Sequence, residues 1–392
     1  MVKLDFSSKC ILLAVGLSLA FGRWGAWFGY PANNIFIIDI ILLLAVVAIF
    51  PIYRIQHRFI LFGFIIFCLY EFTRNPTTSV VLRLRDLLPF VYFILFLILK
   101  YQINSIPKKA IYSMLKIATF VGLIWNLLIS LNILNTIAFE TFAGIPIFSQ
   151  RPDHFGIMAA IGIIVWSKSI FESESKNSLH LIVVNLFILE VFLLPSRAGF
   201  LAMIVGFTFV LMKFKKRKII KTLFLISTLI MASVALSSTL YSLIPDVSVV
   251  KKTISIGKNA NILEQGAGTA RGRIMGQSAL FDWVSSNNLQ LVGGGPGREI
   301  LYESGAVRWL SGYLDVRYPH NWWISLYARF GIFGFILWAF AFIYIWRDSF
   351  QKDFNFSSAI IVAIFIASTF GVIIESPFGI IPLYFFLMRK NL

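Results

Sequence analysis

Long apolar runs recur from one end of this chain to the other, and this feature restricts its fold more than any other. A helix needs about 20 apolar residues to cross a bilayer, and about twelve runs of roughly that order can be placed along the sequence. Only 14% of the residues are charged, whereas a soluble domain carries roughly a quarter. We therefore predict an all-α polytopic membrane protein.

One long polar interval divides the predicted spans into two groups. Residues 1–243 are predicted to hold spans one to nine, residues 244–320 a large external loop with short amphipathic helices, and residues 321–392 spans ten to twelve. The spans are expected at residues 11–28, 35–53, 59–72, 87–99, 110–134, 155–171, 179–194, 199–212, 219–243, 322–346, 359–374 and 379–388.

Lysine and arginine gather in alternate short loops, which predicts the orientation of the spans. The loops near Arg54, Lys108 and Lys215 are basic, whereas the short loops 30–34, 195–196 and 375–378 contain no lysine or arginine. Basic short loops stay in the cytoplasm, so both termini are predicted to be cytoplasmic. The formal charge of +17 is largely explained by these loops, and we expect no nucleic-acid partner.

The two cysteines, Cys10 and Cys68, lie in or beside apolar runs. They form no disulfide framework and no metal-binding spacing. We expect no metal site.

Several arginines fall on the predicted external face, where the orientation rule does not explain them. Translocation of a long loop accounts for the basic residues between 244 and 319, but not for Arg197 in a tight turn or for Arg83 and Arg85 beside a span. Arg197 is either an arginine that extends to the interface or an anion site, with Ser196 capping the following helix. Arg83 either pairs with Asp86 along one helix or, with Arg85, binds a lipid phosphate.

A second basic pair, Arg271 and Arg273, stands at the start of a predicted amphipathic helix. Ile274, Phe281 and Val284 are expected to share one face of that helix, which would lie on the membrane surface. The arginines are either anion ligands or a solvated turn. The glycine cluster at 293–297 that follows predicts a flexible turn through which backbone approaches a ligand.

His320 is the strongest catalytic candidate because it lies at the external mouth of a span. A neutral imidazole can act as a general base near pH 7. Asn321 would orient it or bind a sugar hydroxyl, and Trp322 belongs to an interfacial belt or a stacking platform. Glu375 is an acid at the external end of a span, where it would pair with an arginine or contact the acceptor.

Asp153 is a similar external acid, with Arg151 beside it as an easy salt-bridge partner. We keep both residues as candidates for orienting the acceptor or the sugar.

Four motifs in order resemble the O-antigen ligase and O-antigen polymerase superfamily. They are SRAGFLA, GRIMGQSALFDWV, GGGPG and PHNWWISLYARFGIFGF, the last ending in the Gly331–Gly334 pair. The resemblance is close from about residue 195 to about residue 335, and elsewhere it extends only to the pattern of spans.

This resemblance implies a GT-C-like fold in the bacterial inner membrane, with a large periplasmic loop between helices 9 and 10 and a periplasmic active site. It implies inverting glycan transfer from undecaprenyl pyrophosphate, without a metal and with no cofactor. Arg197 and Arg273 would bind the pyrophosphate, and His320 would activate the acceptor hydroxyl. Gln277 stands where the family often has an aromatic residue, so Arg271 stays a candidate beside Arg273.

Three functions fit these features. A polymerase would join lipid-linked repeat units, and we prefer it because the sequence has no dedicated feature for a lipid A–core acceptor. A ligase would pass finished glycan to lipid A–core. A transporter of the lipid-linked oligosaccharide would favour paired halves, which the sequence lacks. The expected partners are the lipid-linked glycan, an acceptor glycan or lipid A–core, membrane lipid and a chain-length regulator.

Overall fold

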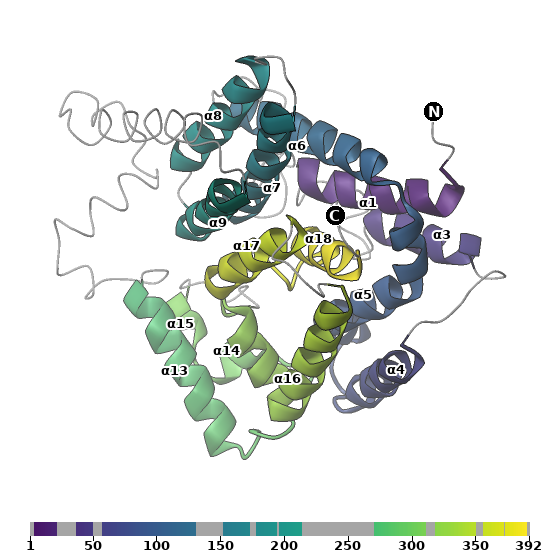
Figure 1. Cartoon of the computed structure of the whole chain (residues 1–392). Coiled ribbons are helices and arrows are strands. Elements are labelled where there is room, and N and C mark those ends of the chain that lie inside the picture. Colours follow the sequence, from purple (N-terminus) through teal and green to yellow (C-terminus); the bar gives the residue numbers. More distant parts are fainter. Residues whose placement is uncertain are drawn as a thin grey trace, which may run out of the picture.

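In the computed structural model of the chain, every regular element of the described part is an α-helix (Figure 1). The prediction of an all-α protein is confirmed for this part. The structure describes residues 4–21, 37–49, 57–130, 152–172, 178–193, 196–213, 270–310, 318–349, 356–371 and 373–389.

The helices outside the interval 244–320 overlap the predicted apolar runs, and α13, α14 and α15 lie within that interval. Their bounds are α1 Phe6–Phe21, α3 Ile37–Ile49, α4 Arg58–Thr73, α5 Val80–Ser105, α6 Lys108–Ser130, α7 Pro152–Glu172, α8 Ser178–Leu193, α9 Arg197–Lys213, α13 Ala270–Ser286, α14 Ile300–Glu303, α15 Val307–Leu310, α16 Trp322–Ser349, α17 Phe356–Phe370 and α18 Pro377–Met388. The predicted ninth span, 219–243, lies outside the described residues.

Among the described helices, two are long and apolar enough to cross a membrane by length and composition, at Lys108–Ile129 and Trp322–Asp348. Several shorter apolar helices accompany them, α17 and α18 included. This content supports a membrane protein, while the number of spans stays a prediction.

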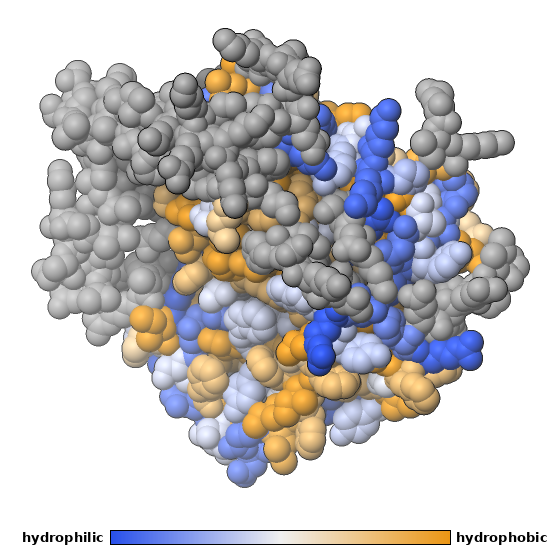
Figure 2. All heavy atoms as spheres, in the orientation of Figure 1, coloured by the Kyte–Doolittle hydropathy of each residue, from blue (hydrophilic) through white to orange (hydrophobic). Residues whose placement is uncertain are grey.

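Several described helices carry exposed apolar stripes, which suit contact with lipid, and those of α4 and α16 are examples. In each stripe the residues recur with the 3.6-residue period of one helix face. Figure 2 shows apolar side chains reaching the surface of the face drawn. These two stripes are Phe59, Phe62, Ile66 and Leu69 on α4, and Phe333, Ile336, Phe340 and Ile343 on α16.

The interior is built around α7, α17 and α18. α7 packs against α6, α8, α9 and α17, and almost every described side chain of α18 is buried (Figure 1). α7 and α9 approach closely through two glycines, since a Cβ on Gly156 would lie 2.0 Å from the Cα of Gly199. Small residues at a crossing let helix backbones touch, as is common between membrane helices.

Charged side chains join helix ends that the loop charges assign to the cytoplasm. The buried ammonium of Lys100 donates to Asp348 at 2.6 Å and lies 2.7 Å from Nε2 of His57. These contacts bring together the start of α4 and the late parts of α5 and α16. Arg389, after α18, donates to the carbonyls of Ile103 and Asn104 beside them. The grouping agrees with the predicted topology, and its cytoplasmic side stays a prediction.

At the other end of the bundle, α16 is broken at Gly331, which has φ 64° and ψ −165°. The break leaves carbonyls on the preceding turn free to accept other hydrogen bonds. Ala328 accepts from the N–H of Gly294 at 2.9 Å, and Arg329 accepts from the N–H of Gly295 at 2.7 Å. Residues 289–297, here called the glycine loop, therefore pair with the helix backbone.

The pairing continues on the other side of the break. The N–H groups of Ile332 and Phe333 donate to the carbonyls of Gln290 and Leu291 at 2.9 and 3.0 Å. A Cβ on Gly331 would lie 2.4 Å from the carbonyl carbon of Leu291. Only glycine combines this left-handed φ with so close a backbone.

A second, smaller core lies between α13, α14, α15 and the first half of α16. Leu280 and Val284 of α13 are fully buried in it, together with Leu310 of α15. The expected shared face of α13 is wrong: Val284 is buried, whereas Ile274 and Phe281 are 63% and 47% exposed. The helix presents its Leu280 and Val284 side to the protein because the one-turn helices cover it.

Candidate functional site

The C-terminal end of α17 and the turn that follows it form the centre of the candidate site. Arg273 in the first turn of α13 donates through Nη1 to the carbonyl of Phe370 at 2.9 Å. Ser196 donates to Oδ1 of Asp153 at 3.0 Å, and Oδ2 of Asp153 would lie 2.7 Å from a Cβ on Gly371. The starts of α7, α9 and α13 therefore meet at one point.

Two further candidates lie at the same turn. Glu375 is 6% exposed and stands two residues before α18. His154, the reserve histidine of the sequence, is 4% exposed and meets Phe378 edge-on with ring centroids 4.4 Å apart. Asp153 accepts from Ser196, whereas its expected partner Arg151 lies outside the described residues.

The start of α16 reaches this turn from another side. Oδ1 of Asn321 accepts from the N–H of Trp323 at 3.0 Å and of Ile324 at 3.3 Å, so it caps the helix. Nε1 of Trp323 donates to Thr369, in the last turn of α17, at 3.3 Å. His320 precedes the cap and is half-buried. The segment that carries His320 therefore lies beside the end of α17.

His320 also has an unusual backbone, with φ at 55°. A non-glycine residue pays of order 1–3 kcal/mol for such a conformation, and such residues cluster at functional sites. Trp322 is 2% exposed and packs edge-on against Trp338 with ring centroids 5.7 Å apart. Its burial leaves no open ring face for a sugar and removes it from the surface belt.

Arg83 lies at the glycine loop, where a Cβ on Gly297 would come within 2.7 Å of its Cγ, whereas Arg85 lies beside Tyr318, two residues before His320. Arg83 is 7% exposed, donates through Nη1 to the carbonyl of Phe72 at 2.6 Å and covers that ring at 4.5 Å. The sequence offered Arg83 as an ion-pair partner for Asp86. In the structure Asp86 pairs with Arg329, at 2.6 Å. Arg85 is exposed, 5.8 Å from the ring centroid of Tyr318.

Arg197 begins α9 directly after its cap. Oγ of Ser196 accepts from the N–H of Gly199 at 3.0 Å, as the sequence predicts. Since Ser196 also touches Asp153, the backbone of Arg197 starts at the α17 turn. The side chains of Arg197 and Arg271 lie outside what the structure describes.

Sequence reasoning did not find the residues that fix the glycine loop. Arg74, after α4, pairs with Glu71 at 2.9 Å and donates to the carbonyls of Val292 and Gly293 at 2.5 and 2.7 Å. Asn75 donates to two further carbonyls of the loop, at 2.9 and 3.1 Å. The glycines thus approach protein backbone, which corrects the expectation that they approach a ligand.

A buried ion pair completes this attachment. Asp86 accepts from Arg329 at 2.6 Å and from the N–H of Gly297 at 2.8 Å, and both ionic side chains are almost fully buried. Arg329 also donates to the carbonyl of Arg298 at 3.2 Å. The sequence contained a signal for this ion pair. Arg329 lies inside a predicted span, where a charged side chain requires a partner.

The comparison with known families matches residues 182–339 to the family described as O-antigen ligase. This match supports the O-antigen polymerase and ligase superfamily. The resemblance read from the motifs is confirmed, and the matched region includes Arg273, the glycine loop and His320. No curated protein matches the chain. The match supports an O-antigen ligase- or polymerase-type function, a glycosyltransferase-like enzyme, and lipid-linked glycan and acceptor substrates in general.

The arrangement at the α17 turn suits an anionic substrate. The helices α7, α9, α16 and α18 begin there, and helix N-termini carry partial positive charge. Arg273 adds a guanidinium, which binds phosphate in a planar, bidentate way. Asp153 and Glu375 supply carboxylates at the turn, and the segment that carries His320 adjoins the end of α17.

Proposed function

We propose that the protein transfers a glycan from a polyprenyl-pyrophosphate donor to an acceptor hydroxyl at the α17 turn. The observation that carries this proposal is the meeting of Arg273, Asp153 and the segment of His320 at that turn. Undecaprenyl pyrophosphate is the donor that the family resemblance implies. The site lies on the periplasmic side of the bacterial inner membrane, with both termini in the cytoplasm.

In the proposed step, the acceptor oxygen attacks the anomeric carbon from the face opposite the pyrophosphate. The bond from that carbon to the phosphate oxygen breaks, and the configuration inverts. His320 accepts the hydroxyl proton, and Arg273, Arg197 and Arg271 stabilise the charge on the departing pyrophosphate. Because the donor already carries a good leaving group, charge stabilisation matters more than acid catalysis.

The acceptor distinguishes two versions of this function. We favour a polymerase, in which the acceptor is a second lipid-linked repeat unit. A ligase that uses lipid A–core is the second candidate, since the matching family is described as O-antigen ligase. Purified protein given lipid-linked repeat units alone decides between them: a polymerase makes longer chains, and a ligase makes none.

The test of the proposed base is His320→Asn. Asparagine tolerates the left-handed backbone, so this variant removes the imidazole and keeps the local fold. We expect loss of transfer by about 10²–10⁴-fold, the usual contribution of a general base, with normal yield of folded protein.

The matched control is His57→Asn. His57 has φ 61° and also precedes a helix, but it lies at the opposite end of the bundle. Transfer should survive this change. Near-normal transfer by folded His320→Asn protein would remove the histidine from the mechanism.

A further inference from the structure

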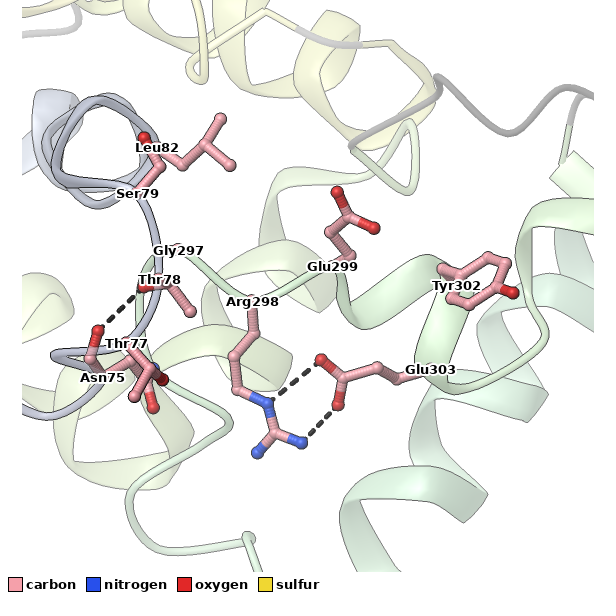
Figure 3. A pocket seen from close by; sticks show the side chains of 10 residues that line it. All are labelled: Asn75, Thr77, Thr78, Ser79, Leu82, Gly297, Arg298, Glu299, Tyr302 and Glu303. Carbon is pink, nitrogen blue, oxygen red and sulfur yellow. Dashed lines mark hydrogen bonds and ion pairs between the residues drawn. The ribbon is translucent and has the colours of Figure 1, made fainter.

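A hollow of about 440 Å³ lies between the α4–α5 turn and α14, and nothing above assigns it a role (Figure 3). One wall carries the hydroxyls of Thr77, Thr78 and Ser79. The other wall is formed by Arg298, Glu299, Tyr302 and Glu303. Its volume is within the usual range of ligand sites, roughly 300–1,000 Å³.

The two walls belong to distant parts of the sequence and are held together by buried contacts. Asn75 donates to the carbonyls of Gly294 and Pro296, and Asp86 accepts from the N–H of Gly297. Gly297 has φ 88°, and a Cβ there would lie 2.2 Å from Oγ1 of Thr78. The hollow is therefore preformed, which lowers the entropy cost of binding.

The charges that line the hollow disfavour a phosphate. The lining contains two carboxylates, Glu299 and Glu303, and one cation, Arg298, so the formal balance is −1. Arg298 is already engaged: Nε donates to Glu303 at 3.1 Å, Nη2 pairs with the second oxygen, and the guanidinium covers the Trp283 ring at 5.1 Å. An anion would meet two carboxylates and an arginine with its charge compensated.

The same side chains suit a ligand rich in hydroxyl groups. Carboxylates accept strong hydrogen bonds from hydroxyls, and threonine and serine both donate and accept. Tyr302 is 61% exposed at the edge of the hollow and offers an apolar ring with a polar tip. Sugar rings present C–H faces and hydroxyl edges, which match this combination.

Apolar and polar side chains meet at the surface beside the hollow, which suits a site at a boundary between lipid and water. Val80 and Leu84, on the adjoining turns of α5, are 50% and 48% exposed and apolar, while Thr77 and Ser79 are exposed and polar. We therefore expect a sugar chain bound here to lie at the surface from which the lipid-linked donor of the proposed function would project.

We propose that this hollow is a subsite for the uncharged part of a glycan chain, separate from the pyrophosphate end. This inference rests on the proposed function, because a second binding site for sugars is needed only if a glycan is bound through its pyrophosphate at the α17 turn. The subsite binds several sugar residues of donor or acceptor and keeps the chain in register between additions.

The experiment uses the purified full-length protein and two variants, Tyr302→Ala and Glu303→Gln. The probe is an oligosaccharide released by mild acid from the surface polysaccharide of the producing cell, carrying neither lipid nor phosphate. We expect each variant to bind it roughly tenfold more weakly by calorimetry, a change of about 1.4 kcal/mol. Asp282→Asn, an exposed acid on α13 outside the hollow, should bind like wild type.

Inorganic pyrophosphate is the competitor that separates the two sites, and it should leave oligosaccharide binding unchanged. Equal binding by wild type and both variants, or displacement of the oligosaccharide by pyrophosphate, would overturn the subsite. Failure of the proposed function gives a different result. The wild-type protein would then transfer no glycan, while its binding of the oligosaccharide would still depend on Tyr302 and Glu303.

Discussion

Removing the carboxylate of Asp86 should cost more stability than any other single change at the glycine loop. Asp86 accepts from the buried guanidinium of Arg329 at 2.6 Å and from the N–H of Gly297 at 2.8 Å. Both side chains of the pair are nearly inaccessible, at 2% and 0% exposure, so solvent does not screen the charge that remains. Breaking a buried pair by removing one partner costs about 3–5 kcal/mol, and we expect a loss in that range for Asp86→Ala.

The assay is unfolding of the purified protein by SDS in mixed micelles, followed by tryptophan fluorescence. A second variant, Asp86→Ala with Arg329→Met, removes both charges and should recover most of the loss, because the cost comes from the unpaired cation. Glu303→Ala is the exposed counterpart, since the Arg298–Glu303 pair is 33% and 29% exposed and should contribute at most about 1 kcal/mol.

Two results would refute this reasoning. One is an Asp86→Ala protein that unfolds within about 1 kcal/mol of wild type, because the pair would then stabilise nothing. The other is a double variant less stable than Asp86→Ala, because the cation would then contribute without its partner.

Two further predictions concern the backbone and the orientation. Gly331→Ala should lower the midpoint of thermal unfolding well below that of Gly305→Ala, because both have a positive φ but only Gly331 lies against other backbone; equal midpoints would mean that the close approach costs nothing. The orientation is tested in cells that produce the protein without its two native cysteines. Ser285→Cys should react with a membrane-impermeant maleimide and Lys109→Cys should not, since both positions are exposed and lie at opposite ends of the bundle. The reverse labelling pattern would mean that the topology is inverted.

The helices could be predicted because each apolar run is long and bounded by polar residues. Ser196 and its following helix were found from local rules alone, since a cap depends on neighbouring residues. The shared face of α13 was predicted wrongly because Ile274 and Phe281 match Val284 in hydrophobicity, and only the position of α15 decides which side is covered.

The glycine loop could not be predicted because its partners are far away in the sequence. Asp86 and Arg329 are 243 positions apart, and no local pattern favours their pairing over that of Asp86 with Arg83. His320 was found through its motif, whereas the meeting of its segment and Arg273 at one end of α17 depends on tertiary packing. Local sequence patterns identify candidate residues, and tertiary packing determines which of the candidates come into contact.

The break in α16 has a consequence for building hybrid proteins from this superfamily. Four backbone hydrogen bonds around Gly331 join α16 to residues 290–295. A graft that replaced the segment containing residues 290–295 alone would keep an α16 shaped for a different partner. A hybrid between relatives should therefore have its junction after Phe333, so that residues 290–295 and the part of α16 to which they are hydrogen-bonded come from the same protein.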